Sequence, residues 1–259
     1  MAAPALSLKN IGMQFGNLKA IDSISLNVEP GGRHAVLGAN GAGKTTLFNT
    51  ITGDLIPTSG RIEMFGHDIT QLSPHSRVRQ GLRRTYQNSQ LFDQLDVKSN
   101  ILIAARGVRS GRYSLRGIQA QDDAVVETNA LMDKLKLGAL ADTLAVSLSH
   151  GQQRQVEVAM ALVGQPTVLL LDEPAAGLSP VERAELTQLL LQLPKDMALV
   201  IVEHDLEIAL RVAHTVTVMH NGQLLAEGTP KDIENNALVQ SVYLGTYSSE
   251  TDDIQNAGH

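Results

Sequence analysis

Residues 38–45 have the sequence GANGAGKT, which matches the pattern G-x-x-x-x-G-K-[ST]. Its glycines allow successive backbone N–H groups to turn inward around an anion, and a helix beginning after them would add its positive end. In such a loop Lys44 reaches the β- and γ-phosphates of a nucleotide, and the Thr45 hydroxyl ligates Mg²⁺. The segment therefore predicts a nucleotide site. Its expected nucleotide contacts are Gly38, Asn40, Gly41, Gly43, Lys44, Thr45 and Thr46.

A buried strand is predicted directly before the loop. Short apolar runs occupy residues 34–37, 167–171 and 198–202. Continuous runs of this length are typical of strands buried on both faces of a parallel sheet covered by helices. Polar residues follow each run, and open α/β sheets bind ligands outside the carboxyl ends of their strands. The sequence therefore predicts an α/β fold in which three strand ends face one site.

The polar residues at the other two strand ends have the chemistry of nucleotide hydrolysis. Asp172 and Glu173 follow the second run. Asp172 would hold Mg²⁺ through its water shell, and Glu173 would orient and deprotonate the attacking water. His204 follows the third run and would donate to the γ-phosphate. The alternatives are two solvated carboxylates and a structural histidine, and the loop at Lys44 favours the hydrolytic interpretation.

Further elements are predicted on both sides of the loop. Residues 6–11 and 21–28 alternate apolar and polar side chains, which indicates an antiparallel, half-exposed sheet. Residues 121–137 repeat apolar positions at helical spacing, and Gly138 is the expected C-cap of that helix.

A second helix is predicted after Glu173. Ser179 and Glu182 form a capping-box pattern with Pro180 at the first helical position. Leucines continue this helix at helical spacing, and Pro194 is its expected end.

The composition excludes several classes of protein. The 259 residues contain no cysteine, which excludes disulfides, thiolate metal sites and a cysteine nucleophile. The 21 Lys and Arg against 27 Asp and Glu give a net charge of −6, so no broad positive field is available to bind nucleic acid. No apolar run approaches the roughly 20 residues of a membrane-spanning helix, and the N-terminus lacks the pattern of a signal peptide. We therefore expect a cytoplasmic chain that binds no nucleic acid and reaches a membrane only by docking on a membrane protein.

Five further segments, correctly ordered and spaced, resemble motifs of one protein family. Residues 148–154 (LSHGQQR) resemble the signature motif of ATP-binding cassette (ABC) proteins. Residues 86–88 resemble the Q-loop of that family, residues 176–179 its D-loop, residues 203–204 its H-switch, and Phe15 its adenine-stacking aromatic residue. The resemblance extends from about residue 6 to residue 245.

This resemblance implies a fold and a domain organisation. The fold is a P-loop NTPase with a RecA-like parallel sheet core, an N-terminal antiparallel β-subdomain and an inserted α-helical subdomain. One nucleotide-binding domain is expected over residues 6–246, with the helical subdomain at roughly 90–163. Residues 247–259 are expected to form a polar C-terminal tail.

The resemblance also implies ATP and Mg²⁺ as ligands and assigns roles at the site. Glu173, His204 and Gln87 are the expected catalytic residues. Gln87 also joins Thr45 and Asp172 as an expected Mg²⁺ ligand. Two departures from the family pattern, His150 for the commonest glycine and Ser179 for aspartate, remove no phosphate-contacting or Mg²⁺-binding group. An active ATPase is therefore expected.

The signature segment has a physical meaning of its own. Ser149 and Gln152 form a capping box, so the helix N-terminus presents a hydroxyl and the Gly151 N–H to an anion. In the family that anion is the γ-phosphate bound to the other subunit. The implied partner is thus a second ABC ATPase, an identical copy or a sister subunit, placed head to tail with two ATP molecules between the subunits. From the residues alone, a well-capped helix is an equal alternative.

Within the family, the chain is most similar to the ATP-binding subunits of branched-chain amino-acid uptake systems. The similar segments include residues 84–88, 172–178 and 225–230. Such subunits pair with transmembrane permease subunits on the cytoplasmic face of the membrane and work with a periplasmic solute-binding protein. Cassette proteins for amides, urea or lipids share much of this pattern. The alternatives are the motor of a lipid or lipopolysaccharide exporter and a soluble ABC ATPase.

The insertion near residues 105–125 places four arginines among glycines and serines. They are Arg106, Arg109, Arg112 and Arg116. One interpretation is contact with lipid headgroups or a permease loop, and the other, which we favour, is a solvated loop.

Overall fold

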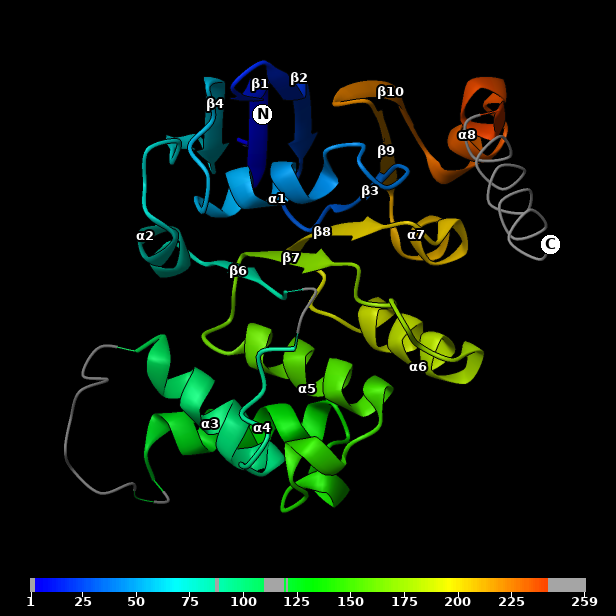
Figure 1. The fold of residues 1–259 in the computed structure, drawn as a ribbon. Helices are drawn as coiled ribbons and strands as arrows, with labels where there is room; N and C mark the ends of the chain where they lie inside the picture. Colours follow the sequence, from blue (N-terminus) through cyan, green and yellow to red (C-terminus); the bar gives the residue numbers. More distant parts are fainter. Residues whose placement is uncertain (1–2, 87–88, 110–118, 120, 242–259) are drawn as a thin grey trace.

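The computed structural model describes residues 3–86, 89–109, 119 and 121–241 (Figure 1). The predictions for Gln87, Arg112, Arg116 and the tail at 247–259 therefore lie outside the described residues.

The core of the structure is a six-stranded sheet with the order β10-β9-β3-β8-β7-β6. Its strands are β3 (Arg33–Leu37), β6 (Leu82–Arg84), β7 (Val168–Asp172), β8 (Ala198–Glu203), β9 (Thr215–His220) and β10 (Gln223–Gly228). Every pairing is parallel except the β9–β10 hairpin.

The three predicted apolar runs are β3, β8 and β7, and they lie side by side in the sheet. Leu37 pairs with Glu203, and Asp172 pairs with Val202, so the three strands end at one edge. This register confirms that their carboxyl ends meet at a common site.

A second, four-stranded sheet is antiparallel and has the order β2-β1-β4-β5. It contains β1 (Leu6–Phe15), β2 (Leu18–Val28), β4 (Ser59–Met64) and β5 (His67–Asp68). The predicted N-terminal strands are therefore confirmed as β1 and β2.

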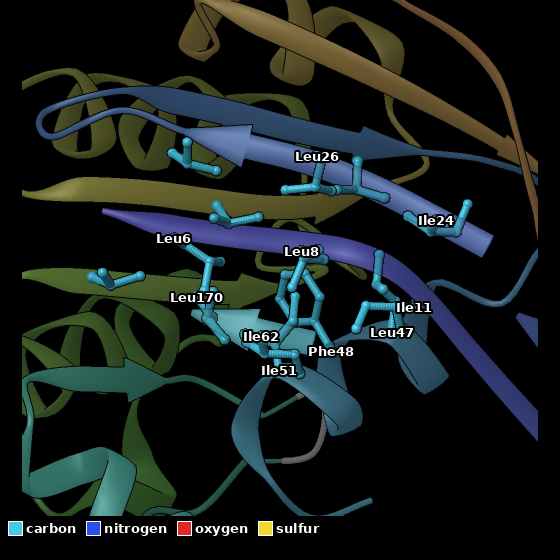
Figure 2. Close-up of a cluster of buried hydrophobic side chains, with 14 of the residues drawn as sticks. Leu6, Leu8, Ile11, Ile24, Leu26, Leu47, Phe48, Ile51, Ile62 and Leu170 are labelled. Atoms are coloured by element: carbon cyan, nitrogen blue, oxygen red, sulfur yellow. The ribbon is translucent and has the colours of Figure 1, made fainter. Parts of the chain in front are cut away.

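Helix α1 (Lys44–Thr52) lies between the two sheets (Figure 1). Figure 2 shows Phe48 and Ile51 of α1 among Leu8 and Ile62 of the antiparallel sheet and Leu170 of β7, all in one hydrophobic cluster. Because this cluster fixes α1 against both sheets, it also fixes the loop from which α1 begins.

Three helices between β6 and β7 form the helical subdomain, at the bottom of Figure 1. They are α3 (Val97–Gly107), α4 (Asp123–Lys134) and α5 (His150–Leu162), with short 3₁₀ turns at Gly138–Leu140 and Ala145–Ser147. Their buried side chains form a separate cluster that includes Ile101, Met132 and Leu137.

The predicted end of α4 at Gly138 was wrong. The helix ends at Lys134, and Lys136 adopts the left-handed conformation (φ 58°) that glycine usually takes at this position. The Leu137 N–H then bonds to the Met132 carbonyl at 2.8 Å. This early ending lets Leu137 enter the subdomain cluster, where it is 1% exposed.

The remaining helices are α2 (Pro74–Arg79), α6 (Pro180–Leu191), α7 (Leu206–Val212) and α8 (Pro230–Glu234). The capping box of α6 is confirmed, with both hydrogen bonds between Ser179 and Glu182 present. The helix ends three residues before Pro194, and the Arg33 guanidinium donates to the carbonyls of Leu190 and Leu193. Arg33 thus adds side-chain hydrogen bonds to carbonyl groups at and just beyond the end of the helix.

Candidate nucleotide site

The phosphate loop connects β3 to α1 and is closely enclosed by neighbouring backbone. A Cβ at Gly43 (φ 98°) would lie 2.6 Å from the Ala20 carbonyl oxygen, and a Cβ at Gly38 would lie 2.5 Å from the Met219 carbonyl oxygen. Only glycine fits these positions without moving the neighbouring chain. The predicted loop geometry therefore depends on β2 and on β9, and β9 lies far from the loop in the sequence.

Lys44 is the first residue of α1, and its side chain folds back over the loop. The Nζ atom donates to the carbonyl oxygens of Gly38 at 2.6 Å and Ala39 at 3.1 Å. Burial lowers the pKa of Lys44, and the carboxylates of Glu173 and Asp172 act in the opposite direction. The ammonium group is thus held at the loop, between the backbone and the acidic strand ends.

An open cavity of about 590 Å³ lies over the loop. Eight of the predicted site residues line it, and they come from β1, the loop, α1 and the end of β7: Phe15, Asn40, Gly41, Gly43, Lys44, Thr45, Thr46 and Glu173. Phe15 is 47% exposed, as an aromatic ring that stacks on a ligand must be. The structure therefore brings together all the predicted phosphate contacts of the loop except Gly38, the predicted adenine-stacking ring and the predicted base.

Sequence reasoning missed one wall of this cavity. Leu18, Lys19 and Ala20 at the start of β2 line it, as do Asn221 and Gly222 in the β9–β10 turn. An Asn-Gly pair between two strands is a strong hairpin signal, but it does not say where the hairpin packs. The Gly222 carbonyl accepts from the Asp22 N–H at 2.7 Å, and the Gly222 N–H donates to the Ala42 carbonyl at 3.1 Å. These bonds hold the turn against both β2 and the phosphate loop.

Asp172 lies buried at the end of β7 and pairs with an arginine. Its Oδ2 atom lies 2.7 Å from Nη2 of Arg84, the last residue of the neighbouring strand β6. Arg84 also donates to Oδ1 of Asn49 on α1 and stacks over the Tyr86 ring, 4.8 Å from its centroid. Arg84 therefore links the predicted metal ligand to α1 and to the residue before Gln87.

Glu173 and His204 meet at the neighbouring strand ends, as predicted. Nδ1 of His204 lies 4.0 Å from Oε2 of Glu173. Glu173 has a left-handed backbone (φ 46°), which is uncommon for a residue with a side chain, and its N–H donates to the Val202 carbonyl at 2.9 Å. The Ala175 N–H, two residues later, donates to Oε1 of the buried Glu203 at 3.0 Å. Strand β8 thus supports the turn that presents Glu173.

The predicted anion contacts of the signature segment lie at the N-terminus of α5, and they are not part of the cavity wall. Both hydrogen bonds of the Ser149–Gln152 capping box are present. The Gly151 N–H and the Ser149 hydroxyl donate to Oε1 of Glu182, at 2.9 and 3.0 Å. A single subunit therefore does not complete the predicted ATP site.

The oxygen groups at the loop fit a nucleotide-bound Mg²⁺ ion. Thr45 supplies a hydroxyl at the start of α1, and Asp172 supplies a carboxylate at the end of β7. Among the described residues, no group of three or more His, Cys, Asp or Glu side chains could hold a metal ion. Because Mg²⁺ usually binds one or two protein ligands together with phosphates and water, this sparse oxygen set suits it.

Comparison with known families shows which family the chain belongs to. A family model described as "ABC transporter" matches residues 21–176, which contain the loop, Asp172 and Glu173. The chain belongs to the ABC transporter family. This ABC ATPase binds ATP, and its hydrolysis of ATP is coupled to transport.

Individual relatives of this ABC ATPase match it over nearly its whole length. The high-affinity branched-chain amino acid transport ATP-binding protein BraF of Pseudomonas aeruginosa is 34% identical over 253 residues, or 95% of this chain and 99% of that protein. The corresponding protein LivG of Escherichia coli K12 is 35% identical with the same coverage. These matches confirm the predicted similarity to this branch of the family.

A solved structure confirms the fold of the ABC ATPase. The ADP conformation of an ATP-binding cassette from an ABC transporter superposes with a TM-score of 0.83. That cassette is 34% identical, and the match covers 93% of this chain and 99% of the other. None of the helices over the described residues has the length and hydropathy of a transmembrane span.

Proposed function

We propose that this ABC ATPase is the motor subunit of an importer for branched-chain amino acids or related amino acids and amides. The observation that carries the proposal is the end-to-end similarity to BraF and LivG, whose names state that transport. The cavity over the phosphate loop and the closeness of Glu173 to His204 support the proposal. The partners are transmembrane permease subunits and, through them, a solute-binding protein. The subunit then works at the cytoplasmic face of the membrane.

ATP binds in the cavity over the phosphate loop. Phe15 stacks on the adenine, and the loop N–H groups with Lys44 hold the phosphates. Thr45, Asp172 and Gln87 would hold Mg²⁺, and the ion would neutralise negative charge on the phosphates. Placing ATP requires Lys44 Nζ to exchange its Gly38 and Ala39 carbonyl partners for phosphate oxygens.

Hydrolysis depends on the acidic turn after β7. Glu173 orients the attacking water and accepts its proton, and His204, 4.0 Å from Glu173, donates to the γ-phosphate. The backbone bond from Glu173 to Val202 and the bond from Ala175 to Glu203 keep the carboxylate at this place. Such fixed positioning lowers the barrier because the water and the base need no reorganisation.

The second half of each ATP site comes from a facing subunit. Ser149, Gly151 and Gln152 of one subunit complete the site over the γ-phosphate held by the other, in a head-to-tail dimer of identical or sister subunits. ATP drives closure only because it binds the closed dimer better than the open subunits. Gln87 and the helical subdomain then relay closure to the permease.

Uptake in cells tests the proposed substrate. In a strain without this chain, uptake of labelled leucine, isoleucine and valine is expected to fall, and the wild-type chain should restore it. Glu173→Gln should not restore it, because the variant lacks the base. Unchanged uptake of all three amino acids in the deletion strain would overturn the assignment of branched-chain amino acids as substrates.

Purification from native membranes in mild detergent tests the partners. Recovery with multi-span permeases and a solute-binding protein would support import. A permease without a solute-binding protein would instead support the exporter alternative, and recovery from the soluble fraction alone would contradict the proposed permease docking.

A further inference from the structure

The Glu182 carboxylate lies where two helices begin, and it binds both of them. Oε1 accepts from the Gly151 N–H at 2.9 Å and from the Ser149 hydroxyl at 3.0 Å, at the start of α5. Oε2 accepts from the N–H and the hydroxyl of Ser179, at 3.0 and 2.8 Å, at the start of α6. One side chain thus joins the signature segment to the D-loop segment through four hydrogen bonds.

The close packing around the Glu182 side chain also explains why residue 151 is a glycine. A Cβ at Gly151 would lie 2.7 Å from Cγ and 2.8 Å from Oε1 of Glu182. Position 151 in this subunit therefore accommodates the carboxylate only because it has no side chain. Gly151 has a helical backbone with no positive φ, so space rather than conformation accounts for the glycine.

Glu182 is present as an anion at this place. The N–H groups of Ser179 and Gly151, followed by the two hydroxyls, lower the pKa of Glu182 to about 2. The carboxylate therefore stays ionised throughout the physiological range, and the positive end of α5 favours its charge.

The two α5 donors bound to Glu182 are the groups that the proposed dimer needs for the γ-phosphate. Gly151 has one backbone N–H, and Ser149 has one hydroxyl proton, so neither can serve a carboxylate and a phosphate fully at the same time. Two anions in one place would also repel each other.

We propose that Glu182 is an internal competitor for the signature segment, and that the γ-phosphate of the facing subunit's ATP displaces its carboxylate when the dimer closes. This inference rests on the head-to-tail dimer given under the proposed function. Displacement breaks only the bonds from Oε1, because Ser179 can still hold Oε2 as the cap of α6. The exchange sets the ATP concentration at which subunits close, and it makes the D-loop segment respond to occupation of the signature segment.

Glu182→Asp is the variant that separates competition from capping. Aspartate is one methylene shorter, so it retreats from Gly151 yet keeps a carboxylate near Ser179. The chain itself shows that aspartate serves in a capping box, since Thr229 and Asp232 form one at the start of α8. Glu182→Gln is the second variant, which keeps the length of the side chain but removes its charge. Glu185→Gln, on an exposed position of α6, is the control for loss of one negative charge.

The experiment measures dimer formation by light scattering against MgATP concentration, with Glu173→Gln in every chain to stop hydrolysis. We expect Glu182→Asp and Glu182→Gln to lower the midpoint ATP concentration, by about tenfold for Glu182→Asp. Glu185→Gln should leave the midpoint unchanged. An unchanged or higher midpoint in both Glu182 variants would overturn the competition. If Glu173→Gln alone never dimerises with ATP, the head-to-tail dimer itself fails, and the competition fails with it.

Discussion

At the scale of single residues, Glu203 is a buried acid at the edge of the site. It is fully buried at the end of β8, and burial raises its pKa to about 7, although the N–H groups of Ala175 and Asp205 act in the opposite direction. Between pH 4.5 and 7, Glu203 is therefore ionised in the unfolded chain but protonated in the folded one. The stability that this group contributes is complete below pH 4.5 and is lost as the pH rises through 7.

Glu203→Gln should remove this dependence on pH. Glutamine keeps the oxygen that accepts from Ala175 but does not titrate. Between pH 5 and pH 8, the unfolding free energy of the wild-type chain should fall by about 2 kcal/mol more than that of Glu203→Gln. Urea unfolding at several pH values measures this difference. Parallel pH curves for the two chains would contradict a raised pKa at Glu203.

Lys44→Ala should remove nucleotide binding while the fold is kept. The Lys44 ammonium bonds to carbonyls of its own loop, so its loss leaves the core unchanged but removes the only charge that the loop sequence offers to phosphates. We expect the affinity for ATP to fall by about a hundredfold or more, and phosphate release to stop. Calorimetric titration with ATP checks the affinity, with Lys9→Ala on the antiparallel sheet as the control. Undiminished hydrolysis by Lys44→Ala would contradict the site assignment.

The roles of single residues were predictable from the sequence where a local motif contains the residue types that the chemistry needs. The loop, Glu173 and His204 fall in this class, and the structure places Glu173 and His204 together. Arg84 and Glu182 gain their roles from partners 88 and 31 positions away, at Asp172 and Gly151. A single sequence contains no signal for such contacts, because they depend on how the strands and helices pack.

At the scale of elements, the β9–β10 turn is a wall of the nucleotide cavity, and Gly222→Ala tests it. Gly222 has φ 77°, and a Cβ there would lie 2.7 Å from the Ala20 carbonyl oxygen. The variant should push the turn away from the loop and raise the KM for ATP by about tenfold, while kcat changes little because Glu173 and His204 lie on other elements.

Gly66→Ala is the matched control for backbone strain in Gly222→Ala. Gly66 also has a left-handed backbone (φ 78°), but it lies in the β4–β5 turn, where the nearest atom to a Cβ is a side-chain carbon at 3.4 Å. The control should lose roughly 1 kcal/mol of stability with no change in KM. Equal KM values for the two variants, measured by steady-state ATP hydrolysis, would show that the turn has no part in nucleotide binding.

Helix starts were predicted better than helix ends. The capping boxes of α5 and α6 each use residues three positions apart, so the sequence contains the whole signal. The end of α4 depends on burying Leu137 in the helical subdomain, and α6 ends where Arg33, more than 150 positions away, meets its carbonyls. Tertiary packing therefore determines where α4 and α6 end.

At the scale of the whole molecule, the arrangement of the sheets followed only in part from the sequence. Buried runs ending in polar residues predicted that three strands end at one site, and they do. The strand order and the position of α1 between two sheets required the structure, because apolar runs carry no information on which strand lies beside which. The apolar runs predicted the α/β class, and the family resemblance supplied the P-loop NTPase fold and the inserted helical subdomain.

The 27.8-kDa chain should assemble as a dimer when ATP is bound and cannot be hydrolysed. The signature donors of α5 bind Glu182, and the cavity over the loop is open, so we expect that no single subunit encloses ATP. Glu173→Gln should bind ATP and fail to hydrolyse it, which should trap a dimer with ATP between the subunits. Light scattering should then report twice the mass of the chain. Adding Lys44→Ala to the same chain should restore the monomer, because ATP no longer binds. A monomer of Glu173→Gln at saturating MgATP would contradict closure by two head-to-tail subunits, whereas a dimer that survives Lys44→Ala would show that contacts other than ATP hold the subunits together.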